Sequence, residues 1–206
     1  VLGNATISTG IGAIDITDTV LSDGVTLTVG DGSAATIAMD AIAGTADAAA
    51  SDVTFNTTGT ITVAESVGTD VGTVTITQSG GATFQDTVST ATVAVTDTTG
   101  TVSFAGDTTL STGLTTAAQD YNLSFTGASN SIAGDTTLLN TGTLTLGDAD
   151  TDSTTFATGL DTTSTSTTTV AGTVTTEGQM DIGALTLAAD TTLDSGTGAA
   201  SVMNIG

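Results

Sequence analysis

The sequence predicts an all-β protein, a right-handed parallel β-helix (β-solenoid), because short strand-like phrases recur along it. In residues 142–146, Gly-Thr-Leu-Thr-Leu, leucines point to one side of a strand and threonines to the other. Variants of this phrase begin at Gly59, Gly72, Gly100 and Gly172. Recurrence of one alternating phrase favours a repeat architecture over a globular fold.

A second phrase gives the expected length of one coil. Gly-Asp-Thr-Thr-Leu occupies residues 134–138 and recurs around Asp107 and, with Ala for Gly, around Asp190. From Asp107 to Asp135 is 28 residues, and from Asp135 to Asp190 is 55, close to twice that. The spacing predicts coils of about 28 residues and therefore roughly seven coils.

The composition supports strands and a folded chain. Thr makes up about a quarter of the 206 residues, and β-branched side chains suit a pleated surface. The chain has 22 acidic residues and no Lys, Arg or His, so its formal charge is −22. Only 11% of residues are charged, whereas 38% are hydrophobic and the mean hydropathy is +0.32. Such a chain has enough apolar surface to fold.

A β-sandwich of pilin type is the alternative fold. It would also use short strands joined by short turns. However, a sandwich core is thick and usually needs more large aromatic residues than the five Phe and one Tyr present here. A narrow coil needs only small and medium side chains, which favours the solenoid.

Taken in order, the alternating segments predict strands separated by turns rich in Gly, Asn and Asp. Strands are expected over residues 13–20, 25–29, 36–42, 53–56, 60–64, 73–77, 82–85, 91–95, 102–105, 108–110, 121–126, 130–132, 136–139, 143–146, 154–157, 167–170, 173–176, 184–188, 191–193 and 201–204. Together they predict one elongated domain over residues 1–206. Residues 33–51 are richest in Ala and are expected to hold a loop or a capping insertion, with a loop or one helical turn over 45–51.

Several function classes are excluded by residues that are missing. Without Cys, His or Lys, a Ser or Thr nucleophile has no usual base, so the chain is expected not to be an enzyme. A wholly acidic chain repels phosphate backbones, which argues against binding nucleic acid. No apolar run approaches the roughly 20 residues that span a bilayer, so no membrane insertion is expected.

One acidic segment is a candidate metal site. Asp148, Asp150 and Asp152 alternate as the first ligands of a calcium loop do. The bidentate Glu of an EF-hand would fall at Gly159, so this is not an EF-hand. Weak Ca²⁺ binding and a solvated turn both remain open, and the chain is expected to require no cofactor.

The Thr-x-Thr phrases suggest a binding face, because flat rows of Thr on a solenoid can order water or contact glycans. They include the pairs at Thr26, Thr60, Thr73 and Thr143. The phrases fall at uneven intervals along the chain, which argues against one regular array.

Residues 174–179, 183–196 and 139–148 resemble the β-strand repeats of large bacterial surface proteins. Such repeats occur in filamentous-haemagglutinin-like exoproteins and autotransporter passengers. The resemblance covers most of residues 52–206 and implies a secreted parallel β-helix at the cell surface. The first residue, Val1, and the lack of a charged segment before an apolar one are consistent with a mature product or an internal segment.

The expected function is that of an extracellular structural protein, a building block of a filament, fibre or surface layer that assembles head to tail. Its expected partner is therefore itself, with cell-surface or environmental glycans as further candidates. The alternatives are a stalk segment of a large secreted adhesin, and an ice- or glycan-binding solenoid with a Thr-rich face.

Overall fold

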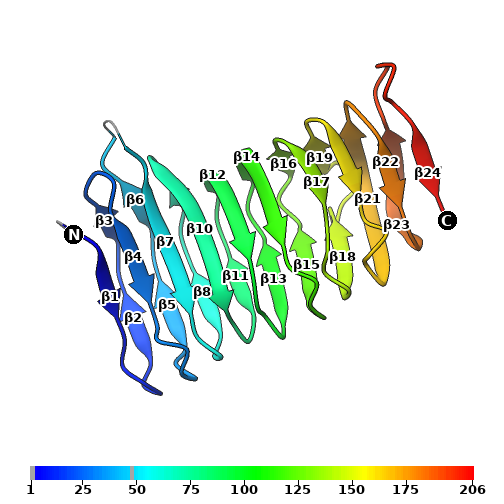
Figure 1. Ribbon diagram of the computed structural model, residues 1–206. Helices are drawn as coiled ribbons and strands as arrows, with labels where there is room; N and C mark the ends of the chain where they lie inside the picture. The colour runs from blue at the N-terminus through cyan, green and yellow to red at the C-terminus, as the bar shows by residue number, and fades with distance from the viewer. Residues whose placement is uncertain (1–2, 47–48) are drawn as a thin grey trace.

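A computed structural model describes residues 3–46 and 49–206 as a β-solenoid of about nine turns. All paired strands are parallel, and no helix occurs in the described residues. The strands stack from β1 to β24 along one axis, so the two ends of the chain lie at opposite ends of the rod (Figure 1). At about 4.8 Å per rung, nine turns give a rod about 43 Å long. This confirms the predicted fold class and excludes the β-sandwich.

Each coil has three sides, and each side stacks into one face of the rod. Face 1 contains β1 (Ala5–Ile7), β4 (Thr26–Val29), β7 (Ser51–Asn56), β10 (Val71–Gln78), the second parts of β12 (Val88–Val95) and β14 (Thr108–Thr116), then β17 (Asp135–Thr137), β20 (Gly159–Asp161), β22 (Met180–Ile182) and β24 (Met203–Ile205). Its ladder of hydrogen-bonded strands is interrupted between β14 and β17.

Faces 2 and 3 have continuous ladders. Face 2 contains β2 (Ile14–Ile16), β5 (Ile37–Met39), β8 (Ile61–Val63), β11 (Ala82–Phe84), β13 (Thr101–Phe104), β15 (Asn122–Phe125), β18 (Thr143–Leu146) and the first parts of β21 (Thr167–Thr176) and β23 (Leu185–Asp194). Face 3 contains β3 (Thr19–Leu21), β6 (Ile42–Gly44), β9 (Val67–Gly68), the first parts of β12 and β14, β16 (Ser129–Ile132), β19 (Ser153–Phe156) and the second parts of β21 and β23. The first and second parts of these long strands are residues 88–90 and 92–95 of β12, 108–110 and 113–116 of β14, 167–170 and 172–176 of β21, and 185–187 and 191–194 of β23.

The coils are shorter than predicted. Residues paired in adjacent coils are between 17 positions apart (Thr168 with Leu185) and 26 positions apart (Thr26 with Asp52), not 28. The repeated unit is one side of the coil, about seven residues, and the same phrase serves different faces. The phrase at Asp107 enters face 3, and the one at Asp135 lies on face 1 four sides later. A spacing of 28 therefore measures four sides, which is one and a third coils.

Residues 33–51 belong to the ordinary coils. They contain β5 on face 2 and β6 on face 3, and both strands pair with the coil before and the coil after. The loop or helical turn expected over 45–51 forms no helix in its described part, and it joins two coils inside the rod. Residues 47–48 lie outside the described residues.

The core consists of columns of identical or similar side chains, one residue from each rung. Rings of Phe84, Phe104 and Phe125 stack on face 2, with centroids 5.0 and 4.8 Å apart and planes within 5° of parallel. In-register parallel pairing brings them together, because each occupies the same position of its strand. The five Phe and the one Tyr are all buried, so every aromatic residue of the chain lies in the core.

Tyr121 predicts how stability depends on alkaline pH. Burial raises the pKa of its phenol from 10.0 to about 12, because the charged form loses its hydration. The stabilisation is fully present below pH 10, where the phenol is neutral in folded and unfolded chains. It is lost progressively as the pH rises from 10 towards 12, because the unfolded chain ionises first.

We therefore expect the melting temperature to fall between pH 10 and 12. No other side chain of this sequence titrates in that range, since Lys, Arg and Cys are absent. Tyrosinate absorbance reports this one residue directly, and Tyr121→Phe should give a flat profile over the same range. An equal fall in the Tyr121→Phe variant would assign the effect to another cause.

Candidate functional site

The candidate metal ligands lie in the loop between β18 and β19. The main chain of this loop forms a turn and is not extended. The Asp152 carboxylate points inward, and its Oδ2 accepts hydrogen bonds from the main-chain N–H groups of Asp148 (2.8 Å) and Ala149 (3.0 Å). The side chains of Asp148 and Asp150 are exposed. Asp152 thus serves to close the turn.

No group of three or more acidic side chains is placed to hold a metal ion within residues 3–46 and 49–206. The alternation of Asp148, Asp150 and Asp152 would align their carboxylates only in an extended strand. The segment is a turn, so the alternation does not bring them together. Ca²⁺ binding at these residues stays a prediction without support from the geometry.

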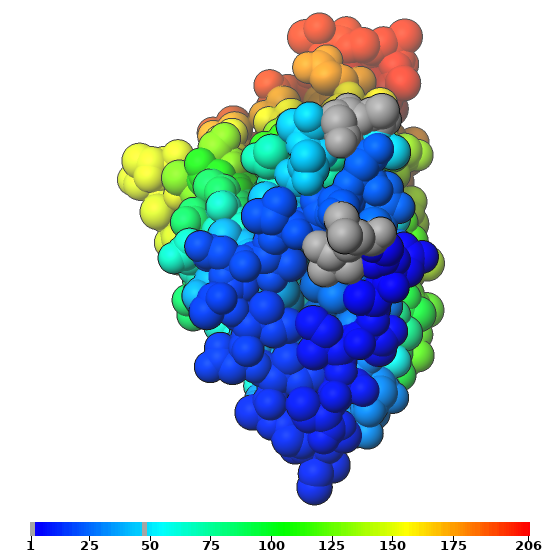
Figure 2. Space-filling model, turned by 90° about the vertical axis from the view of Figure 1, so that its left-hand side faces the viewer, coloured from blue at the N-terminus to red at the C-terminus, as the bar shows by residue number. Residues whose placement is uncertain are grey.

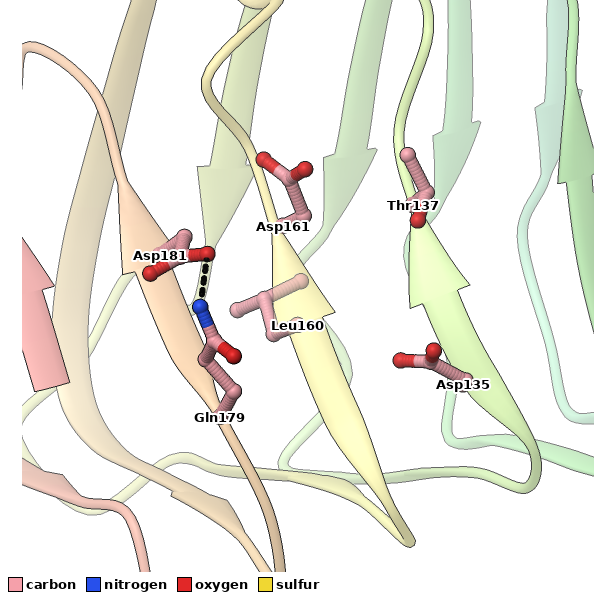
Figure 3. A pocket seen from close by; sticks show the side chains of 6 residues that line it. All are labelled: Asp135, Thr137, Leu160, Asp161, Gln179 and Asp181. Carbon is pink, nitrogen blue, oxygen red and sulfur yellow. Dashed lines mark hydrogen bonds between the residues drawn. The ribbon is translucent and has the colours of Figure 1, made fainter. Parts of the chain in front are cut away.

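A groove of about 210 Å³ opens on face 1, near the C-terminal end of the rod. Its lining residues come from β17, β20, β22 and the turn before β22: Asp135, Thr137, Leu160, Asp161, Gln179 and Asp181 (Figure 3). Asp161 and Asp181 are register partners in adjacent coils. The groove is therefore acidic, and sequence reasoning missed it because its three Asp residues are far apart in the chain.

The carboxylates of this groove are held by local hydrogen bonds. Asp181 accepts from Gln179 Nε2 and from Asn204 Nδ2, each at 2.6 Å. Asp161 accepts from the main-chain N–H of Thr163 (2.9 Å) and from its hydroxyl (2.7 Å). Acid–base hydrolysis of a glycoside needs one carboxyl kept protonated by an apolar setting, which this open polar groove does not supply. That the chain is not an enzyme stays a prediction.

The ends of the rod differ from its sides in what they expose. Of the large apolar side chains that are exposed in the described residues, all but Leu139 lie in the first coil or from β23 onward: Ile7, Ile11, Val20, Leu187, Val202, Met203 and Ile205. Figure 2 views the rod from the end that the first coils form. The apolar surface of the molecule is therefore concentrated at its two ends.

Four of these residues continue core columns. Ile7 is the register partner of buried Val29, and Leu187 of buried Val170. Met203 and Ile205 continue the columns of buried Met180 and Ile182. Each is exposed only because no further coil covers it.

Outward-facing hydroxyls form a long column on face 2. The register joins seven consecutive coils through Thr62, Thr83, Ser103, Ser124, Thr145, Thr169 and Thr186. The Thr-x-Thr phrases themselves do not form one array, as expected, because those that begin at Thr26 and Thr73 lie on face 1 and those that begin at Thr60 and Thr143 lie on face 2. The column of face 2 also contains Ser and Thr from other segments. The corners between strands differ in length, which makes the sequence intervals between column residues uneven. Strand pairing nevertheless places these residues in register.

No helix of the described residues is both long enough and apolar enough to cross a membrane. No family profile, curated protein or solved structure matches this chain, so its likeness to bacterial surface repeats rests on the sequence pattern alone.

Proposed function

We propose that this chain is an extracellular structural protein whose copies stack end to end into a filament, fibre or surface layer. The observation that supports this best is the concentration of exposed apolar side chains at the two ends of the rod. A second copy would cover Ile7 at one end and Leu187, Met203 and Ile205 at the other, extending the core columns from one molecule into the next.

Unpaired strand edges favour the same contact. Among the described residues, strands β1 and β2 pair only with the following coil, and the second part of β23 pairs only with the preceding one. Their outer N–H and C=O groups are templates for another strand. A contact between unlike ends is heterologous, and it gives a filament when the rotation between copies does not close a ring.

Electrostatic repulsion opposes stacking. Every copy adds a formal charge of −22 and no cationic side chain. Salt reduces this repulsion, because the screening length falls from about 10 Å at 0.1 M to about 3 Å at 1 M. Divalent ions bridging carboxylates of two copies, or protonation near the isoelectric point of about 4.1, would act in the same direction.

The assembly is therefore expected to depend on ionic conditions. Light scattering and negative-stain microscopy should show rods that lengthen in 1 M salt or in Ca²⁺, and that shorten after chelation in dilute buffer. Leu187→Asp should abolish this growth, because it places a charge on an end of a core column. Leu139→Asp is the matched control, since it adds the same charge to an exposed leucine that lies away from both ends, in the seventh coil.

A chain that stays monomeric in every condition would contradict self-stacking. That result would favour the stalk alternative, in which further coils of a longer secreted solenoid cover the same end columns. Equal loss of assembly in the Leu187 and Leu139 variants would show that added charge, not the end contact, controls association.

A further inference from the structure

The hydroxyl column of face 2 is accompanied by a second one, two residues earlier on each strand. There Thr101 pairs with Asn122, and Thr143 with Thr167. Asn122 Oδ1 accepts hydrogen bonds from both the main-chain N–H and the hydroxyl of Thr143, at 2.8 and 2.9 Å. Face 2 therefore carries one column of hydroxyls over seven rungs and a shorter polar column over four, because Gly81 and Ala184 stand two residues before Thr83 and Thr186.

Strand geometry fixes the spacing of these columns in two dimensions. Rungs lie about 4.8 Å apart along the rod, and residues two apart on a strand are about 6.6 Å apart. The ladder of face 2 runs from β2 to the first part of β23 without the register shifts that occur in the β7–β10 pair of face 1. The stacked Phe rings support it from behind. The array is therefore regular and rigidly backed.

The hydroxyls of the first column are available for an external partner. None of the seven makes a hydrogen bond within the described part of the chain. Thr186 is exposed and the other six are partly exposed, so this column forms the outer surface of face 2. A rigid row of unsatisfied hydroxyls will order whatever hydrogen-bonding lattice meets it.

Charge separates faces 2 and 3 from face 1. Among the described strands, face 3 has one acidic residue, Asp194 of β23, and face 2 has one, Asp15 of β2. Strands β8, β11, β13, β15, β18 and the face 2 parts of β21 and β23 contain no acidic residue, although the chain carries 22. Face 1 carries Asp52, Asp135, Asp161 and Asp181 on its strands. A neutral strip on so acidic a rod fits a neutral partner and would not select cations.

We infer that face 2 binds ice. Its two spacings are close to the repeats of the oxygen lattice on ice crystal planes, and Thr offers a hydroxyl for hydrogen bonding beside a methyl that confines water. Sugar rings of a polysaccharide usually stack on aromatic side chains, and all six aromatic residues of this chain are buried. Water ordered by the array would merge with the crystal lattice over seven rungs.

The test compares two pairs of register partners, each with one Ser and one Thr in adjacent coils. Ser124→Tyr with Thr145→Tyr interrupts the column of face 2. Thr109→Tyr with Ser131→Tyr makes the same change on face 3. Thermal hysteresis and inhibition of ice recrystallisation are measured in dilute buffer for the full chain and both double variants, with circular dichroism to verify folding.

We expect the natural chain to show thermal hysteresis, the face 2 variant to lose most of it, and the face 3 variant to keep it. No ice activity in the natural chain, or equal loss in both folded variants, would overturn the inference. So would retention on crystalline cellulose or chitin without any ice activity. The inference does not rest on end-to-end stacking. Ile205→Asp places a charge on the end of a face 1 column and should weaken stacking, but it leaves the strands of face 2 unchanged and should keep the ice activity.

Discussion

Replacing Phe104 with alanine is expected to lower the free energy of unfolding by about 3–5 kcal/mol. The ring is fully buried and lies between those of Phe84 and Phe125, so the substitution removes buried area and leaves a cavity between two coils. It also removes two stacked ring contacts, each worth about 0.5–1.5 kcal/mol. Because each coil contacts only its neighbours, one such gap weakens the coupling between the two halves of the rod.

Urea unfolding followed by circular dichroism measures this effect. Phe156→Ala is the matched control, because Phe156 is equally buried but has no aromatic neighbour in the part of the chain that the structure describes. We expect Phe104→Ala to lower the free energy of unfolding by about 1–2 kcal/mol more than Phe156→Ala does. Equal costs would mean that the Phe stack adds nothing beyond burial, and a cost below about 1 kcal/mol for Phe104→Ala would mean that the coils repack around the gap.

The Phe stack illustrates how much of this fold the sequence could predict. Alternation along each strand identified inward residues such as Phe104, and recurrence of the strand phrase identified a parallel solenoid. The length of a coil could not be obtained in the same way. Three faces use one alternating phrase, so the repeat seen in sequence counts sides, and only strand pairing shows that three sides complete a coil.

The residues that lie beside each other in adjacent coils were harder to predict than the strands themselves. Thr62 and Thr83 are 21 positions apart and Thr145 and Thr169 are 24 apart, yet both pairs are in register. Corners of different length conceal this alignment in the sequence. The three Asp residues of the acidic groove on face 1 are brought together in the same way. Conversely, Asp148 and Asp152 are near in sequence but are used differently, because a turn places one outside and the other inside.

Gly100→Ala is expected to destabilise the rod by at least about 2 kcal/mol, through overpacking at a corner between faces 1 and 2. A Cβ at Gly100 would lie 2.2 Å from the carbonyl oxygen of Gly80, and one at Gly80 would lie 2.7 Å from that of Thr58. At this corner the main chain of one coil rests directly on the next. The atom that a Cβ at Gly100 would meet is a main-chain oxygen, which cannot move aside as the end of a flexible side chain can. The two coils must therefore separate locally.

The control is Gly68→Ala on face 3, where an added Cβ would meet only Ser89 atoms at 3.6 Å, an ordinary contact distance. In that variant the free energy of unfolding should be unchanged or higher by about 0.4–1 kcal/mol, because Ala reduces the conformational freedom of the unfolded chain. Urea unfolding of both variants beside the natural chain gives the comparison. If Gly100→Ala and Gly68→Ala had equal stability, coil contacts at this corner would be looser than the main-chain distances imply, and the glycine there would be dispensable.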